Sequence, residues 1–156
     1  MPLAYASICS LLLCVRDTHS GYERRVSVEI AELLERHVAL PRCVAELRHA
    51  VGALAARAGA TEHQRQDIAL AVSEGVTNAV THAYPRRAAP GTVAVHAALH
   101  HNVLEVVIAD HGIGMPAPHT QPHAGRGLAI IARTVQHLEI SDAAPGTLVR
   151  MTFAVG

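Results

Sequence analysis

The sequence is poor in aromatic residues and in cysteine. Aromatic residues make up 3% of the 156 residues, with no tryptophan, whereas hydrophobic residues make up 50%. Any core must therefore be built from alanine, valine, leucine and isoleucine, and the length fits one domain. The three cysteines, Cys9, Cys14 and Cys43, form no C-x-x-C pair. The missing pair argues against a zinc site, and together with the odd number of cysteines it favours a reduced, cytoplasmic protein.

A net charge and a long hydrophobic run are also missing. The 13 Lys and Arg residues balance 13 Asp and Glu residues, which argues against direct binding of nucleic acid. The apolar run from Leu3 to Val15 is shorter than the about 20 residues that a membrane-spanning helix needs. No Lys or Arg precedes this run, as a secretory signal would require. We therefore expect an ancillary or poorly ordered extension without membrane association, and a membrane or export role is the weaker alternative.

Histidine, in contrast, is abundant, with 12 residues, and raises the question of a metal site. His100, His101, His119 and His123 could in principle converge. The sequence contains no H-E-x-x-H motif and no compact set of His and Cys residues, however. Histidines on the surface are therefore the better interpretation.

The N-terminal part of the chain has an ambiguous pattern. From Glu23 to Arg36, apolar residues at i, i+4, i+7 and i+8 predict an amphipathic helix, although the alternation in RVSVEI leaves a strand open. We accordingly divide the chain into an N-terminal extension over residues 1–35, partly disordered or helical, and a domain over residues 36–156.

Clearer signals follow for two helices. A helical pattern over residues 42–58 is followed by Gly59, a plausible stop, and Thr61 then provides an N-cap for a helix over residues 62–83. Tyr84-Pro85 ends this second helix, because a residue before proline is disfavoured in the helical region.

The second half of the chain contains mainly strands. The expected strands span residues 92–100, 103–110, 138–141 and 146–154, with a loop over 111–125 and a helix over 127–137. Because strands mostly neighbour strands along the chain, the sheet must be mixed or largely antiparallel. The predicted fold class is an α/β (α+β) two-layer sandwich with helices on one face.

The stretch SEGVTNAVTHAY, residues 73–84, carries polar side chains at helical spacing. Glu74, Asn78 and His82 lie at i, i+4 and i+8, so on a helix they form one row beside an apolar stripe. An Asn oxygen suits Mg²⁺, which takes one or two protein oxygens together with those of a phosphate. Glu74 could take a proton from a nucleophile aimed at the terminal phosphate. Taken alone, the stretch is better interpreted as a solvated Glu and an Asn that happens to lie mid-helix.

A first glycine motif follows a predicted strand. Asp110-x-Gly112-x-Gly114 places a carboxylate at the strand end, where it can accept a hydrogen bond from an exocyclic amino group such as N6 of adenine. The glycines allow the backbone to approach a flat ring or a phosphate closely. An ordinary Asp-x-Gly turn after a strand is the alternative interpretation.

A second glycine motif opens the third predicted helix. The free N–H groups at the start of a helix after Gly125-Arg126-Gly127 form an anion site. The pattern differs from a Rossmann fingerprint, because Ile130 stands where the third glycine belongs and no βαβ unit surrounds it. A Walker A motif is absent from the sequence as well. A nucleotide would therefore be bound by another design.

Together, four motifs occur in a characteristic order: Glu-x₃-Asn-x₃-His on a helix, Asp-x-Gly-x-Gly after a strand, Gly-x-Gly-Leu at a helix start, and Gly146-Thr147 entering the last strand. This order resembles that of the GHKL, or Bergerat-fold, ATPases. The compact size, SEGVTNAVTHAY and the closing GTLVRMTF look most like the stand-alone bacterial anti-sigma factor serine/threonine kinases. The resemblance covers about Arg36 to Phe153 and implies a Bergerat fold that binds ATP and Mg²⁺.

The resemblance also implies roles for individual residues. Asn78 would bind Mg²⁺, Glu74 would be the general base, and His82 would lie near the phosphates. Asp110 would bind the adenine amino group, with Thr147 supporting that end of the site. The remaining contacts to adenine and phosphates would come from the glycine motifs, namely Gly112, Gly114, Gly125, Arg126 and Gly127.

By the same resemblance, the protein phosphorylates an anti-anti-sigma (STAS-like) protein and sequesters a sigma factor, with a homodimer as one form. Two features depart from the family: the lid between Gly114 and Gly125 is short and proline-rich, and His123 stands where some relatives have an arginine. The short lid argues for the alternative of a catalytically silent nucleotide-binding regulatory module that acts by protein contact, whereas the retention of Glu74 argues for the kinase, which is the leading hypothesis. A third hypothesis is a detached catalytic domain of a two-component histidine kinase, although the sequence shows no phosphoacceptor helix.

Overall fold

The computed structural model of the protein describes residues 8–16, 23–85, 89–114, 126–143 and 145–156. These residues form six strands and three helices. In chain order the elements are β1 (Ile8–Arg16), β2 (Glu23–Val38), α1 (Pro41–Arg57), α2 (Glu62–His82), β3 (Thr92–His100), β4 (Val103–Asp110), α3 (Arg126–Thr134), β5 (His137–Asp142) and β6 (Thr147–Ala154).

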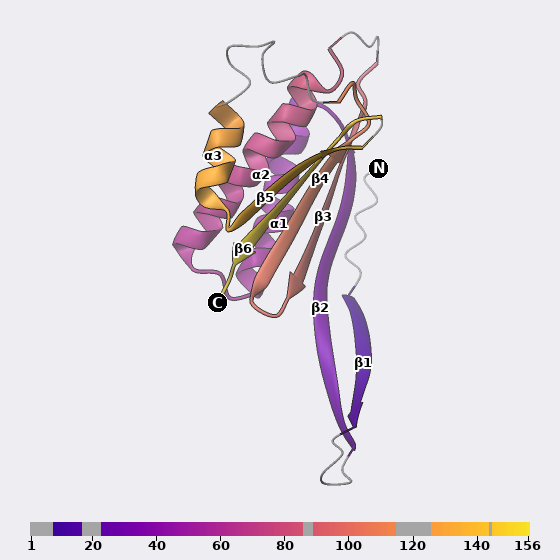
Figure 1. Ribbon diagram of the computed structural model, residues 1–156, viewed down its shortest axis with the longest axis vertical. Helices are drawn as coiled ribbons and strands as arrows, with labels where there is room; N and C mark the ends of the chain where they lie inside the picture. The colour runs from indigo at the N-terminus through magenta and orange to yellow at the C-terminus, as the bar shows by residue number, and fades with distance from the viewer. Residues whose placement is uncertain (1–7, 17–22, 86–88, 115–125, 144) are drawn as a thin grey trace.

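The strands form one sheet in the order β1-β2-β3-β4-β6-β5. Every strand pair among the described residues is antiparallel. The three helices lie on one face of this sheet (Figure 1). The two-layer α+β sandwich predicted from the sequence is therefore confirmed. No helix in the described ranges combines the length and the apolar content needed to cross a membrane.

Strand β2 corrects the prediction of a helix over residues 23–36. The second half of β2 pairs with β3, in a register that places Leu33 opposite Ala97 and Leu34 opposite His96. Neighbouring side chains point to opposite faces of a strand. Accordingly Leu33 is buried under the helices, whereas Leu34 is 56% exposed on the other face. A helix would have placed both on one stripe, so the alternation in RVSVEI was the better signal.

The N-terminal segment also differs from the disordered or helical extension that we predicted. Strand β1 pairs with the first half of β2, from Ile8 opposite Ala31 to Arg16 opposite Glu23. Figure 1 shows this hairpin extending beyond the part of the sheet that the helices cover. The division of the chain at residue 36 stays a prediction, and β2 crosses that position.

The first two helices match their sequence signals. Helix α1 has Pro41 in its first turn, and Gly59 beyond its end adopts φ 81°, the left-handed region that glycine tolerates. At the start of α2, Thr61 Oγ1 accepts a hydrogen bond from Gln64 N, and the Gln64 side chain accepts one from Thr61 N. This reciprocal capping box fixes the residue at which α2 begins. The start of the helix in turn determines which face of α2 carries the catalytic candidates.

The last elements have slightly different bounds from those predicted. Helix α3 ends at Thr134, whereas the prediction continued to His137, which instead begins β5. Thr134 Oγ1 donates to the carbonyl of Ile131 at 3.0 Å, a side-chain bond near the end of this helix. The predicted loop over residues 111–125 is described only as far as residue 114, so the rest of that prediction lies outside the described residues.

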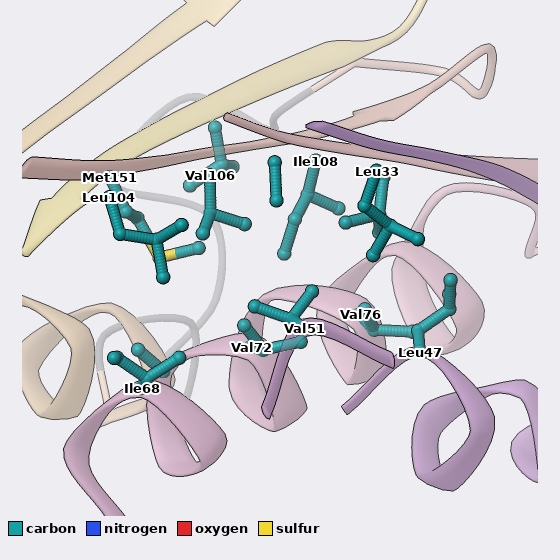
Figure 2. Close-up of a cluster of buried hydrophobic side chains, with 14 of the residues drawn as sticks. Leu33, Leu47, Val51, Ile68, Val72, Val76, Leu104, Val106, Ile108 and Met151 are labelled. Atoms are coloured by element: carbon teal, nitrogen blue, oxygen red, sulfur yellow. The ribbon is translucent and has the colours of Figure 1, made fainter. Parts of the chain in front are cut away.

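Aliphatic side chains fill the space between the helices and the sheet. Figure 2 shows Leu104, Val106, Ile108 and Met151 of the sheet facing the side chains of α1 and α2, all of them buried. Helix α2 approaches the sheet closely at Gly75, where an added Cβ would lie 2.6 Å from Cδ1 of Ile108. Because α2 lies this close to β4, the polar row that α2 carries runs along the edge of the core.

Candidate active site

Helix α2 directs Glu74 and Asn78 toward the start of α3. Both residues are partly buried and lie one helical turn apart. An added Cβ on Gly127 would lie 2.9 Å from Oε2 of Glu74 and 3.3 Å from Nδ2 of Asn78. A carboxylate, a carboxamide and a helix N-terminus therefore meet at one point, and the absence of a side chain at position 127 makes the room.

Strand β4 ends in the buried side chain of Asp110, which is 6% exposed. Its Oδ1 accepts a hydrogen bond from Gly112 N at 2.8 Å. This bond fixes the rotamer of the carboxylate at the point where the strand becomes a loop. A fixed, buried carboxylate is a suitable acceptor for an amino group such as that of adenine.

The loop after β4 is also attached to the end of α2. Ile113 N donates to the carbonyl oxygen of Ala83 at 2.9 Å. Gly112 lies so close to the same residue that an added Cβ would be 2.1 Å from the Ala83 oxygen. Only glycine fits at position 112, because a real Cβ does not approach another heavy atom so closely. The loop after β4 and the end of α2, which carry the two ends of the site, are therefore joined by backbone contacts.

Tyr84 contributes to this junction, and our sequence reasoning did not identify it as a site residue. Its Oη accepts hydrogen bonds from His111 N at 2.9 Å and Thr92 N at 3.2 Å, and it donates to the Thr92 carbonyl at 2.6 Å. The ring lies against Gly91, where an added Cβ would be 2.1 Å from ring carbons. The sequence feature that could have identified Tyr84 is its place two residues after the Glu-Asn-His row, in a chain with only three tyrosines.

The start of β6 closes the site behind Asp110. Gly146 adopts φ 119°, and an added Cβ there would lie 1.9 Å from the Asp110 carbonyl oxygen. The next residue, Thr147, is buried at 7% exposure. Gly114, at φ 77°, lies near the Gly146 carbonyl. Gly146, which precedes Thr147, therefore lies against Asp110, and Gly114 lies beside Gly146.

Three other predicted site residues are less well placed by the structure. His82 is exposed at the last residue of α2, one turn beyond Asn78. Arg126 is the first residue of α3. Gly125 lies outside the described residues, as do His119 and His123 of the histidine set considered above.

A surface hollow lies elsewhere, between α1 and α2, and its lining contains none of the predicted site residues. It is formed by Arg48, His49, Gly52, Ala53, Ala56, Glu62, Arg65, Gln66 and Ala69. We place the site by the convergence of functional groups on Gly127 and Asp110, because the residues that line the hollow belong to none of the four sequence motifs.

The residues at the start of α3 fit a magnesium ion better than a transition metal. Within the described ranges no group of three or more His, Cys, Asp or Glu residues could hold a metal. Mg²⁺ needs no such group, since it retains water and takes one or two protein oxygens plus phosphate oxygens. The Asn78 carboxamide, beside the space above Gly127, offers one such oxygen.

The antiparallel sandwich and the Glu74–Asn78 pair facing a helix start define the class of Bergerat-type ATPase domains. A family profile described as "Histidine kinase-like ATPase domain" matches residues 37–153. The chain belongs to the histidine kinase-like ATPase domain family.

Two curated relatives narrow this class. The "Serine-protein kinase RsbW" of Bacillus pumilus (strain SAFR-032) is 30% identical over 141 residues, which cover 80% of this chain and 86% of the relative. The "Anti-sigma F factor" of Caldanaerobacter subterraneus subsp. tengcongensis is 33% identical over 121 residues, which cover 70% of this chain and 83% of the relative. The chain is thus classed with the serine/threonine protein kinases of this family and resembles its anti-sigma factors.

Solved structures agree with this assignment. The RsbU and RsbW domains of Rv1364c from Mycobacterium tuberculosis match 85% of this chain with a TM-score of 0.65 and 26% identity, and this chain covers 34% of that one. The histidine kinase domain from the Erythrobacter litoralis EL346 blue-light activated histidine kinase matches 74% of this chain and 60% of its own, with a TM-score of 0.54. At 24% identity, the second likeness concerns the fold alone.

Proposed function

We propose that this protein is an ATP- and Mg²⁺-dependent serine/threonine kinase that also acts as an anti-sigma factor. It transfers phosphate from ATP to an anti-anti-sigma (STAS-like) protein. The observation that supports this most strongly is the convergence of Glu74 and Asn78 on Gly127, with 2.9 and 3.3 Å from their side-chain atoms to an added Cβ. Phosphoryl transfer requires mainly positioning and charge stabilisation, and these groups offer both.

Each group has a specific task in this proposal. The Asp110 carboxylate accepts a hydrogen bond from the adenine amino group, and the backbone at Gly112 and Gly114 forms the adjacent wall. The N–H groups at the start of α3, at Arg126 and Gly127, bind phosphate oxygens. The bound Mg²⁺, with Asn78 as a ligand, would neutralise the negative charge of the phosphates.

Glu74 acts on the partner protein in this proposal. Its carboxylate takes the proton from the serine or threonine hydroxyl of the STAS-like protein as that oxygen attacks the terminal phosphate of ATP. The phosphate moves to the hydroxyl oxygen, and ADP leaves. His82, exposed at the end of α2, lies on the phosphate side without a chemical role in the transfer.

The protein partners form the second part of the proposal. The relatives named above, one a serine-protein kinase and one an anti-sigma F factor, support a protein that both phosphorylates and sequesters. The protein binds a sigma factor in the cytoplasm, and phosphorylation of the STAS-like partner decides which partner stays bound. It acts as a homodimer, for which the sheet face opposite the helices offers the exposed Leu34 and Val38.

The substitution Glu74→Gln tests the chemical part of this proposal. We expect ATP binding to persist and phosphate transfer to a STAS-like protein to fall about 100-fold or more, because general base catalysis is worth 10²–10⁴ in rate. The measurement is transfer of labelled phosphate from Mg²⁺-ATP, with nucleotide affinity measured separately.

Glu139→Gln is the matched control, since Glu139 is an exposed carboxylate on β5, away from the Glu74–Asn78 pair. It should leave transfer unchanged. A wild-type protein that binds ATP but phosphorylates no STAS-like protein would instead be the silent regulatory module.

A further inference from the structure

The loop that carries the candidate adenine site is held by three consecutive backbone amides, each with its own acceptor. His111 N donates to Tyr84 Oη at 2.9 Å, Gly112 N to Asp110 Oδ1 at 2.8 Å, and Ile113 N to the Ala83 carbonyl at 2.9 Å. Two of the three acceptors thus belong to adjacent residues, Ala83 and Tyr84. The position of the loop relative to α2 is therefore set by the two residues that follow this helix.

The Tyr84 hydroxyl also reaches a second segment. It donates to the Thr92 carbonyl and accepts from Thr92 N, which fixes it against the first residue of β3. With one O–H donor and two acceptor lone pairs, a hydroxyl can make these two bonds and the one from His111 at the same time. The oxygen therefore sits at a fixed point between the start of β3 and the end of β4.

Two glycines make this arrangement possible. The Tyr84 ring occupies the place of a side chain at position 91, and the Ala83 backbone occupies the place of one at position 112, each 2.1 Å from an added Cβ. Both contacts form only where glycine stands. Glycine at positions 91 and 112 therefore allows residues 83–84 to contact the strands and the loop.

We propose that Tyr84 is a positioning residue for the adenine end of the nucleotide site. Its hydroxyl accepts the hydrogen bond from His111 N. This bond fixes the turn in which Gly112 N orients the Asp110 carboxylate. Tyr84 itself touches neither the adenine nor the transferred phosphate. The proposal rests on the nucleotide function proposed above and adds a residue to it that acts on nucleotide affinity through the loop.

The test compares Tyr84→Phe with Thr134→Val in the full chain. Tyr84→Phe keeps the ring against Gly91 and removes only the hydroxyl. Thr134→Val also removes one hydroxyl that bonds to the main chain, at the far end of α3. For each protein we would measure the affinity for ATP and ADP, KM and kcat for ATP, and amide hydrogen exchange at His111 by NMR.

For Tyr84→Phe we expect about three- to tenfold weaker binding of both nucleotides and a similar acceleration of exchange at His111, because of the three bonds of the hydroxyl only the one from His111 N holds the loop. KM for ATP should rise with kcat unchanged, because the transferred phosphate lies at the other end of the site. Thr134→Val should change none of these quantities.

Unchanged affinity in Tyr84→Phe would overturn this inference and leave the proposed function standing. Equal losses in both variants would also overturn it, because they would indicate general loosening. A wild-type protein that binds neither nucleotide would overturn the proposed function and the inference together.

Discussion

At position 127, the proposed site requires glycine more than the fold does. In a helix, alanine is normally more stable than glycine by about 0.5–1 kcal/mol. Here, however, a Cβ would lie 2.9 Å from Oε2 of Glu74. This oxygen is the end of a flexible side chain, so it can move away without unfolding the protein, but it then leaves its place beside α3.

We therefore predict that Gly127→Ala leaves the free energy of unfolding unchanged or slightly raised and lowers phosphate transfer by about 10- to 100-fold, as small misplacements of a catalytic group do. Urea unfolding and the transfer assay measure the two effects.

Gly52→Ala on α1 is the matched control, since an added Cβ there has no neighbour within 4 Å. It should stabilise the protein by about 0.5–1 kcal/mol with normal transfer. Normal transfer in Gly127→Ala would contradict the assigned position of Glu74.

The buried Cys43 gives a pH-dependent prediction. Burial raises the pKa of this thiol above its ordinary value of 9.0, and the nearby Glu46 adds to the effect. A raised pKa in the folded state favours the thiol form, so its contribution to stability is complete below pH 9 and is lost as the pH rises through the folded-state pKa.

In a variant with Cys9 and Cys14 changed to serine, Cys43 should react with a disulfide reagent only at the rate of unfolding at pH 7 to 8, since the thiolate is the reactive form. The readout is the reaction rate with and without denaturant across this pH range. Rapid reaction of the native protein at pH 7.5 would show that this part of α1 is more open than the structure indicates.

At the scale of elements, helix α2 organises the molecule. Its length, its capping box and its row of Glu74, Asn78 and His82 were all predictable, because they depend on neighbours within a few residues. Its close approach to the sheet was not predictable, because it depends on which strand lies beneath Gly75. The structure identifies that strand as β4, through Ile108.

This contact predicts a coupling between Gly75 and Ile108. Gly75→Ala alone should destabilise the protein by about 1 kcal/mol, because overpacking against Ile108 Cδ1 costs about 1–3 kcal/mol and the helix gains less. In an Ile108→Val background, where this methyl group is absent, the same substitution should be neutral or stabilising. A double-mutant cycle in urea should therefore give a coupling energy of about 1 kcal/mol. Additive effects would contradict the packing described for α2.

Strand β2 shows where element prediction failed. Val26, Ile30, Leu33 and Leu34 fit helical spacing, while RVSVEI also fits alternation, and short apolar segments are ambiguous by periodicity alone. The outcome was decided by partners far along the chain, since β2 obtains its backbone hydrogen bonds from β1 and β3. Such pairing is invisible in a local window of sequence.

At the scale of the whole molecule, the proposed site combines residues that are distant in sequence. Glu74 and Asn78 come from α2, Asp110 from the end of β4, Gly127 from α3 and Thr147 from the start of β6. The order of the motifs allowed the residues and the fold class to be predicted, and the structure supplied their distances. Tyr84 was missed because its hydroxyl acts on backbone amides 8 and 27 residues away, a relation without a sequence pattern.

The most direct test of the account is thermal unfolding of the purified protein with and without Mg²⁺-ATP. A ligand at 100 times its dissociation constant stabilises the folded state by about 2.7 kcal/mol, which corresponds to a rise in Tm of roughly 5–10 °C for a domain of this size. We predict this rise for the wild-type protein and its loss in Asn78→Ala and in Asp110→Asn, each of which should remain folded. The absence of a shift in the folded wild-type protein, or a full shift in both variants, would contradict a nucleotide site between α2, the end of β4 and α3.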